Sequence, residues 1–230
     1  MDPKLDVHGQ ACQDYHYQNK ASKLFLNNDY GPPDRMVMEV FFRDELSISE
    51  LEEYALSLCS GKVLDIGAGV GSSALILQQR GLEVTAMEIS PKLTDIMKNR
   101  GVKRVVKEDV FKFRGQKFDT ILLMMNGIGV VGTLAKFEQF LIHLKDLLYS
   151  GGQVLFDSSD IRYLYKKTEL PMEHYYGEIK YQFQYEDQKG KWFYIDQELL
   201  IDLSTKHGWI TQIIYQDAND QYLARLIKKV

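Results

Sequence analysis

The stretch that decides the fold is "KVLDIGAGVGSSALILQQRGLEVTAMEIS", residues 62–90. It begins with an apolar run of strand length, which is followed by a glycine cluster, a segment of helical period and a second apolar run. The second run ends on the acidic residue Glu88. This order predicts a strand, a glycine turn, a helix and a second strand that lies parallel to the first.

The same alternation continues after Glu88. Because parallel strands need crossover connections, helices are expected on both faces of their sheet. The N-terminal two-thirds of the chain is therefore predicted to be α/β and doubly wound, with a mostly parallel sheet. The further strand patterns cover residues 102–107, 118–124 and 152–157, and the further helical patterns cover residues 91–100 and 134–149.

The last third of the chain has a different pattern. "GEIKYQFQYEDQKGKWFYID", residues 177–196, alternates apolar and polar side chains, which predicts an added β-hairpin with a turn near Lys189-Gly190. A helix is expected at 197–207, and the runs 209–216 and 222–229 flank a turn signal. Those two runs predict an antiparallel strand pair that closes the sheet.

The N-terminal part is expected to form a cap. Residues 34–59 are predicted to be mostly helical, and residues 1–33 are predicted to be irregular because they are polar and aromatic and end near Gly31-Pro32-Pro33. We expect one domain over residues 1–230. Its three parts are an N-terminal cap (1–60), a cofactor-binding core (61–160), and the hairpin with the C-terminal part of the sheet (161–230).

Composition excludes several classes of protein. The chain has 230 residues, 45% of them hydrophobic, which is enough for one well-packed core. A net charge of −4 gives no overall attraction to nucleic acid or to an anionic membrane. There are two cysteines, Cys12 and Cys59, and no apolar run of the roughly 18–20 residues that span a bilayer. The N-terminus also lacks an apolar signal core, so a reduced, cytoplasmic protein is expected.

The glycine cluster and the acid after it predict a nucleotide-like ligand. Gly67, Gly69 and Gly71 let the backbone approach a ligand where a Cβ atom would collide. Glu88, at the end of the second strand, is placed to accept hydrogen bonds from two ribose hydroxyls. These features alone suit NAD and other adenosine cofactors equally.

The spacing of the glycines and a second acid separate these cofactors. A dinucleotide fingerprint has the spacing G-x-G-x-x-G, whereas "GAGVGS" has G-x-G-x-G. Asp65 lies two residues before the first glycine, where a carboxylate would repel a pyrophosphate but attract an ammonium or sulfonium group. The pattern thus favours a cofactor that carries positive charge near Asp65.

These motifs together resemble one known family. "VLDIGAGVG", Glu88 after "EVTAM", and "EDVFKF" before "FDTILLMMNGIG" are similar, in motif and in order, to the class I S-adenosylmethionine-dependent methyltransferases. The resemblance covers roughly residues 60–160, and the closing antiparallel pair fits the seven-stranded form of that fold. It implies S-adenosylmethionine as cofactor and a direct displacement in which an acceptor atom attacks the sulfonium methyl group. Such a reaction does not always need a dedicated base, because orientation and exclusion of water supply much of the acceleration.

The resemblance also implies roles for individual residues. Asp65 is expected at the methionine end of the cofactor, Glu88 at the ribose, and Asp109 at the adenine edge. Met125 and Asn126 follow the fourth strand and are expected to face the acceptor side. The full set of candidate cofactor-binding residues is Asp65, Gly67, Ala68, Gly69, Gly71, Glu88, Ile89, Asp109, Val110, Met125 and Asn126.

The acceptor chemistry is less specific. Asn126 is followed by "GIG", without the prolines and the aromatic residue of the family members that methylate amino groups of bases or glutamine. Asp157 and Asp160 lie near strand ends, where acids usually form caps or turns, so no metal site is predicted. His143 is expected to be structural. His16 and His174 are open candidates for the pocket or for the surface, and no catalytic residue is assigned.

Aromatic segments outside the shared motifs are the expected source of acceptor recognition. They are residues 163–194 and an N-terminal group made up of Tyr15, His16, Tyr17 and Tyr30. Their rings suit a flat or cationic acceptor, although the hairpin could equally form a buried apolar face or a dimer contact. Residues 15–30 are predicted to form a mobile cover over the acceptor pocket.

Three functional classes follow from the sequence. The first is a methyltransferase that acts on a small molecule, which the acidic charge favours. The second is a methyltransferase that acts on protein or RNA, and the third is a non-catalytic module that binds S-adenosylmethionine. Neither the acceptor nor the oligomeric state is indicated, and no membrane partner is expected.

Overall fold

The computed structural model of the chain describes residues 6–19, 24–28, 32–165, 169–184, 188–218 and 220–229. For residues 183, 184 and 188–191 it describes the backbone alone. In the described residues, no helix is both long enough and apolar enough to cross a membrane.

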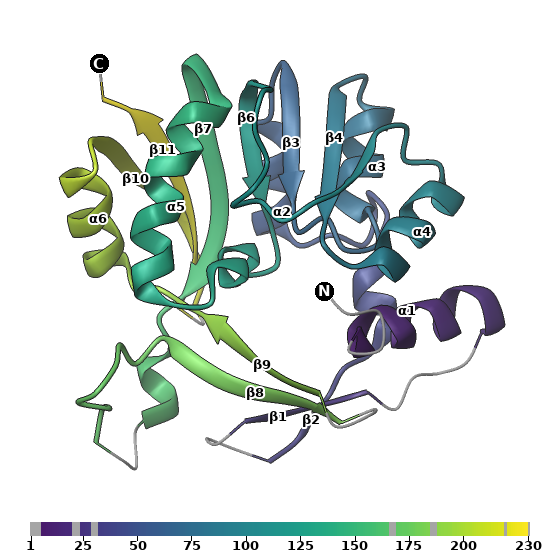
Figure 1. Ribbon diagram of the computed structural model, residues 1–230, viewed down its shortest axis with the longest axis horizontal. Coiled ribbons are helices and arrows are strands. Elements are labelled where there is room, and N and C mark those ends of the chain that lie inside the picture. Colours follow the sequence, from purple (N-terminus) through teal and green to yellow (C-terminus); the bar gives the residue numbers. More distant parts are fainter. Residues whose placement is uncertain are drawn as a thin grey trace.

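The main sheet has seven strands in the order β10-β11-β7-β6-β3-β4-β5 (Figure 1). The five strands from β7 to β5 are parallel, and β11 pairs antiparallel with both β7 and β10. This confirms the predicted mostly parallel sheet with an antiparallel C-terminal pair. The strands are β3 (Lys62–Ile66), β4 (Glu83–Glu88), β5 (Val105–Lys107), β6 (Phe118–Leu123), β7 (Leu148–Ser159), β10 (Trp209–Gln216) and β11 (Gln221–Lys228).

Helices cover both faces of this sheet because successive strand residues point to opposite sides. Leu64 packs in one apolar cluster with α5 (Leu134–Leu147) and α6 (Gln197–Lys206). Its neighbour Val63 packs in a second cluster with α2 (Glu50–Ser57), α3 (Ser72–Gln79) and α4 (Pro91–Arg100). The sheet is therefore doubly wound, and the chain forms two apolar layers around it.

A second, four-stranded sheet lies across the carboxyl ends of the parallel strands (Figure 1). Its antiparallel strands have the order β2-β1-β8-β9 and are β2 (Asp34–Arg35), β1 (Phe25–Asn28), β8 (Glu178–Gln184) and β9 (Gln188–Phe193). The predicted hairpin is β8 and β9. The predicted turn at Lys189-Gly190 is wrong, because both residues lie within β9, where they pair with Gln182 and Tyr181.

The N-terminal segment is more ordered than the sequence predicts. Irregular structure is expected over residues 1–33, but this is wrong for β1 and for the helix α1 (Val7–Gln18). Asp6 caps α1, and α1 packs against α4. Only Val7, Gly9, Ala11 and Cys12 of α1 are buried, so its apolar stripe is too narrow to give a helical signal. Residues 34–59 contain α2 and the short 3₁₀ helix η2 (Met38–Phe41) rather than mostly helix.

Candidate active site

The loop after β3 has the backbone conformation that requires glycine. Gly67, Gly69 and Gly71 have φ values of 69°, 57° and 85°, a region that L side chains rarely adopt. A Cβ atom at Gly71 would lie 2.8 Å from Val102 Cγ2 and 2.9 Å from Met97 Cγ. Gly71 thus also lets α3 begin close to α4.

Glu88 connects the end of β4 to this loop. Its carboxylate accepts backbone N–H bonds from Gly69 at 3.1 Å, Ile89 at 2.8 Å and Ser90 at 3.0 Å. Burial raises the pKa of Glu88, and the bonds from these N–H groups oppose that rise. Two carboxylate oxygens have about four acceptor positions, so Glu88 keeps capacity for a ligand hydroxyl while it holds the glycine loop.

Asp65 is a buried carboxylate without a full set of partners. Its side chain lies within β3 and is 3% exposed, and its Oδ2 atom has no hydrogen-bond partner in the described part of the chain. Burial, together with the nearby charge of Glu88, raises the pKa of Asp65 to about 7. A buried carboxylate of this kind is costly unless it is paired, so the site is suited to a cationic ligand group.

The turn after β6 is held in a strained conformation. Met125 and Asn126 have φ values of 61° and 53°, which is unusual for two successive residues other than glycine. The Asn126 N–H donates to both carboxylate oxygens of Asp157, at 2.9 Å and 2.8 Å, and Gln221 Nε2 donates to Asp157 Oδ2 at 2.8 Å. Burial raises the pKa of Asp157 to about 6, against the effect of these bonds. The Asp157 carboxylate thus fixes the turn that presents Asn126.

The loop after β5 lies beside the end of β4. The Glu108 N–H donates to the Glu88 carbonyl oxygen at 3.3 Å, and Asp109 Oδ1 accepts from the Phe111 N–H at 3.0 Å. Val110 is buried, and its carbonyl oxygen lies 2.8 Å from Nε2 of the buried His143. His143 therefore has the structural place that the sequence predicts, and it anchors the loop that carries Asp109.

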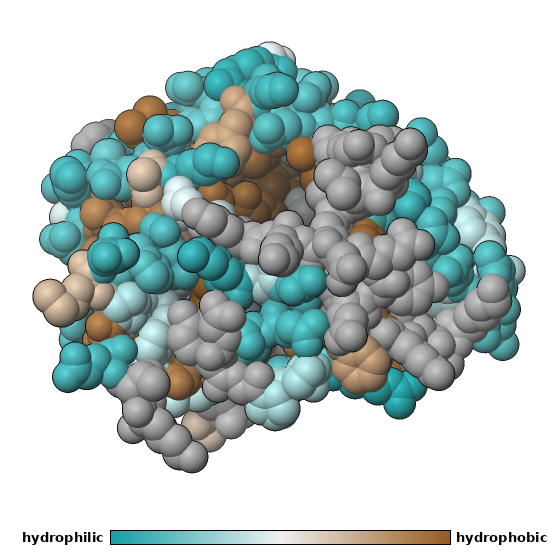
Figure 2. Space-filling model, turned by 60° about the horizontal axis from the view of Figure 1, so that its bottom comes forward, coloured by the Kyte–Doolittle hydropathy of each residue, from teal (hydrophilic) through white to brown (hydrophobic). Residues whose placement is uncertain are grey.

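All the candidate residues lie at one edge of the sheet, where β3, β4, β5 and β6 end. Two of them are apolar residues that stay partly exposed there, Ile89 at 40% and Met125 at 37%. Figure 2 looks onto the face that carries the second sheet and shows a hollow with apolar atoms at its bottom. An apolar hollow with a few convergent polar groups is the usual form of a small-molecule site.

Most of the predicted N-terminal aromatic residues are engaged elsewhere. Tyr15 packs on Phe42 with ring centroids 5.0 Å apart, His16 Nε2 lies 2.8 Å from Asn99 Oδ1, and the Tyr17 hydroxyl donates to Asp95 at 2.9 Å. The contacts of His16 and Tyr17 attach α1 to α4, and Tyr15 packs α1 on Phe42 at the end of η2. Tyr30 lies outside the described residues.

His174 is exposed on the surface. Within the described ranges, no group of three or more His, Cys, Asp or Glu side chains is placed to hold a metal ion.

The chain belongs to the methyltransferase-domain family, because the family model described as "Methyltransferase domain" matches residues 35–209. A solved structure of a SAM-dependent methyltransferase from Bacteroides fragilis, in complex with S-adenosyl-L-homocysteine, is 35% identical. That match covers 100% of this chain and 98% of the other, with a TM-score of 0.92. These findings confirm the resemblance to class I S-adenosylmethionine-dependent methyltransferases.

More distant matches share the fold or a segment of sequence. A glycopeptide N-methyltransferase, MtfA, complexed with S-adenosylmethionine is 18% identical, with a TM-score of 0.56 over 78% of this chain and 93% of the other. The demethylmenaquinone methyltransferase of Tropheryma whipplei (strain Twist) is 29% identical over 100 residues, 41% of this chain. The matched segment spans 40% of that curated relative.

Proposed function

We propose that this protein transfers a methyl group from S-adenosylmethionine to a small-molecule acceptor. The observation that carries the proposal is the buried Asp65 carboxylate, whose Oδ2 atom has no partner in the described residues and which lies directly before a glycine loop. S-adenosylmethionine carries an ammonium and a sulfonium group, so it supplies the positive charge that this carboxylate lacks.

The remaining candidate residues fit the other parts of the same molecule. Glu88 has acceptor capacity left for a ribose hydroxyl, and the glycine loop with Ala68 offers backbone for close approach. Ile89 offers apolar surface next to Glu88. We assign Asp109 and Val110 to the adenine side, because their loop begins beside the Glu88 carbonyl group.

When bound, S-adenosylmethionine supplies a methyl group that is activated by its positively charged sulfur. The protein's own contribution is to hold the acceptor in line with that methyl group and to keep water out. Met125 and Asn126 are assigned to the acceptor side, because they follow β6 at the same edge of the sheet. The Asp157 carboxylate fixes their turn. No residue is assigned as a general base.

The acceptor is proposed to be a small molecule for two reasons. The second sheet lies across the carboxyl edge, which restricts the approach of a large polymer (Figure 1). The net charge of −4 also gives no general attraction to RNA. The partial match to a demethylmenaquinone methyltransferase is compatible with this class of acceptor.

Calorimetric titration tests the cofactor assignment. S-adenosylhomocysteine is expected to bind, and NAD is not expected to compete. Asp65→Asn is expected to weaken S-adenosylmethionine, because it removes a buried negative charge that would pair with the cation. Tight binding of NAD without either adenosyl ligand would refute the proposal. Binding of both adenosyl ligands without methyl transfer to any small-molecule acceptor would instead favour a non-catalytic module or a polymeric acceptor.

A further inference from the structure

The short 3₁₀ helix η3 (Gly127–Val131) joins the proposed cofactor loop to the second sheet. On one side, Val130 Cγ1 lies 3.3 Å from the position that a Cβ atom of Gly67 would take. On the other side, a Cβ atom at Gly129 would lie 2.1 Å from Cε2 of Trp192, so the indole packs directly on the Gly129 backbone. Trp192 is therefore separated from the glycine loop by a single turn of chain.

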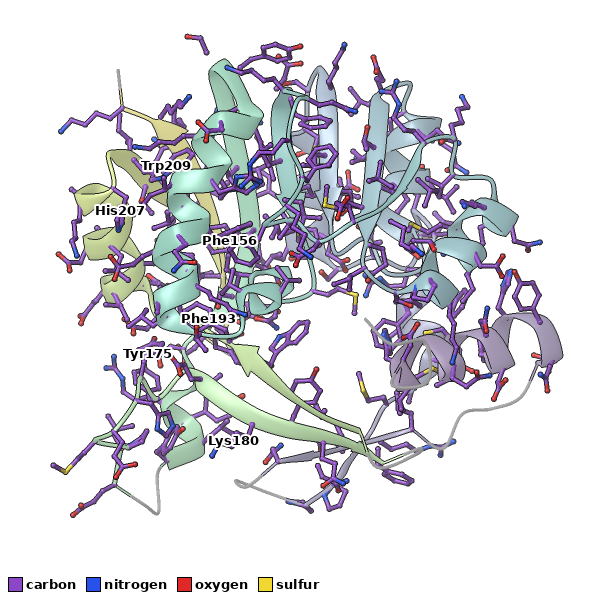
Figure 3. The ribbon with its side chains drawn as sticks, in the orientation of Figure 1. Phe156, Tyr175, Lys180, Phe193, His207 and Trp209 are labelled. Atoms are coloured by element: carbon purple, nitrogen blue, oxygen red, sulfur yellow. The ribbon has the colours of Figure 1, made fainter. Side chains whose placement is uncertain are left out.

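The strand register places a second aromatic ring beside Trp192. In the β8–β9 pair, Ile179 lies opposite Trp192 and Tyr181 lies opposite Gly190. Because side chains alternate across a strand, Ile179, Tyr181 and Trp192 share one face. Since Trp192 contacts η3, this is the face turned toward the carboxyl edge of the main sheet. In Figure 3, side chains from β8 and β9 point into the space below that edge.

Tyr181 and Trp192 form what we call the aromatic wall. Their ring centroids are 6.1 Å apart and their planes meet at 82°, an edge-to-face arrangement. Both rings are only partly buried, although their neighbours Ile179 and Phe193 are 7% and 0% exposed. An inward-facing pair of rings that keeps exposed surface is suited to contact a ligand.

The polar side chain of Asn126 lies at the N-terminal end of η3. The Gly129 N–H donates to the Asn126 carbonyl oxygen at 2.9 Å, which ties the Trp192 contact to the turn that the Asp157 carboxylate holds. The side-chain Oδ1 atom of Asn126 is buried and has no hydrogen-bond partner in the described residues. An acceptor atom of this kind is costly unless a donor reaches it, so a ligand hydroxyl or amino hydrogen would satisfy it.

We propose that the methyl acceptor is a flat, uncharged aromatic ring that carries a hydroxyl or amino group. The ring stacks against the aromatic wall, and the hydroxyl or amino hydrogen is donated to Asn126 Oδ1. This inference rests on the proposed function, since it places the acceptor beside the cofactor loop. The two wall residues carry no cationic group, so they offer no counter-charge to an anionic ring.

The test uses calorimetry on the full chain saturated with S-adenosylhomocysteine. The probe is 2-naphthol, compared with decahydro-2-naphthol, which keeps the hydroxyl but is not flat, and with 2-methoxynaphthalene, which keeps the ring but has no donor. A stacked aromatic pair is worth about 0.5–1.5 kcal/mol, so 2-naphthol should bind roughly three- to tenfold more tightly than decahydro-2-naphthol. It should also bind more tightly than 2-methoxynaphthalene, and Asn126→Ala should abolish that second difference.

Variants locate the binding. Trp192→Leu and Tyr181→Leu should each weaken 2-naphthol roughly three- to tenfold, while S-adenosylhomocysteine affinity stays close to wild type. Tyr149→Leu is the matched control, because Tyr149 is a tyrosine that is 41% exposed near the start of β7, at the opposite edge of the sheet.

Several outcomes would overturn the inference. They are no binding of 2-naphthol, equal affinity for the flat and saturated probes, unchanged affinity in both leucine variants, or competition between 2-naphthol and S-adenosylhomocysteine. If S-adenosylhomocysteine itself failed to bind the wild-type chain, the proposed function would fail first, and that result is distinguishable from loss of naphthol binding alone.

Discussion

Asp65→Asn should make the ligand-free protein more stable while it weakens the cofactor. The wild-type carboxyl is 3% exposed, and its pKa is raised from 3.8 to about 7, mainly by burial. In the unfolded chain this group ionises near its ordinary pKa. Between these two values the folded state holds a proton that the unfolded state has lost, so stability falls as the pH rises through that range. Asparagine has a similar shape and no charge to bury.

The size of the effect follows from the pKa shift. A rise of about three units, at about 1.36 kcal/mol each, corresponds to about 4 kcal/mol once Asp65 is ionised in the folded state. Part of this decrease in the free energy of unfolding has already occurred at pH 5, because the carboxyl of the unfolded chain ionises near pH 3.8. Between pH 5 and pH 8, the free energy of unfolding of Asp65→Asn should therefore gain about 3 kcal/mol relative to wild type.

Urea unfolding of both ligand-free proteins at several pH values measures this difference, and comparing the two removes the contribution of Asp157. S-adenosylmethionine affinity should show the opposite trend. In wild type it should fall below about pH 7, because Asp65 must then release a proton to pair with the cation, and in Asp65→Asn it should be weaker and less dependent on pH. A stability difference that does not change with pH would refute this account of Asp65.

Three further changes test other parts of the site. Glu88→Ala should weaken S-adenosylhomocysteine affinity at least tenfold, because a hydrogen bond to a charged group is worth roughly 1.5–3 kcal/mol. The control Glu83→Ala, at the exposed start of the same strand, should leave the affinity unchanged. Equal affinities of the two variants would place the ribose elsewhere. Gly71→Ala should lower the free energy of unfolding by more than Gly81→Ala. Both glycines have positive φ (85° and 87°), but of the two only Gly71 has side chains against its Cβ position. Equal losses in urea unfolding would show that the packing of Val102 and Met97 against Gly71 is unimportant. Amide hydrogen exchange in residues 10–30 should slow when S-adenosylhomocysteine and an acceptor bind. The reason is that Asp6, at the start of α1, accepts a hydrogen bond from the Ser90 hydroxyl next to Glu88. Full activity after truncation before Ala21, or equal protection without ligand, would count against a mobile cover.

The parts of the site that sequence could predict are local in the chain. The glycines, Asp65 and Glu88 lie within residues 62–90, where strand, turn and helix patterns follow one another without interruption. Each role depends on a strand end or a backbone angle, both of which a short stretch of sequence specifies. The order of elements also predicts the parallel sheet and its antiparallel closing pair, which the structure confirms.

The parts that sequence could not predict depend on contacts between distant residues. β1 is four residues long and becomes a strand through pairing with β8, as in the match of Phe25 with Gln184. Such pairing depends on tertiary context more than on propensity. The Asp157 carboxylate reaches the Asn126 N–H across 31 positions, and Trp192 meets Gly129 only because β9 lies against η3. No pattern within any one of these segments encodes its partner.

A crystal structure of the chain in complex with S-adenosylhomocysteine tests the central claim most directly. The account predicts the ligand at the carboxyl edge of β3 and β4, with its ammonium group within about 3.2 Å of the Asp65 carboxylate and a ribose hydroxyl on the carboxylate of Glu88. The adenine should lie against the loop of Asp109 and Val110, and the sulfur should face Asn126. A ligand bound away from this edge, or a ribose held by groups other than Glu88, would contradict it.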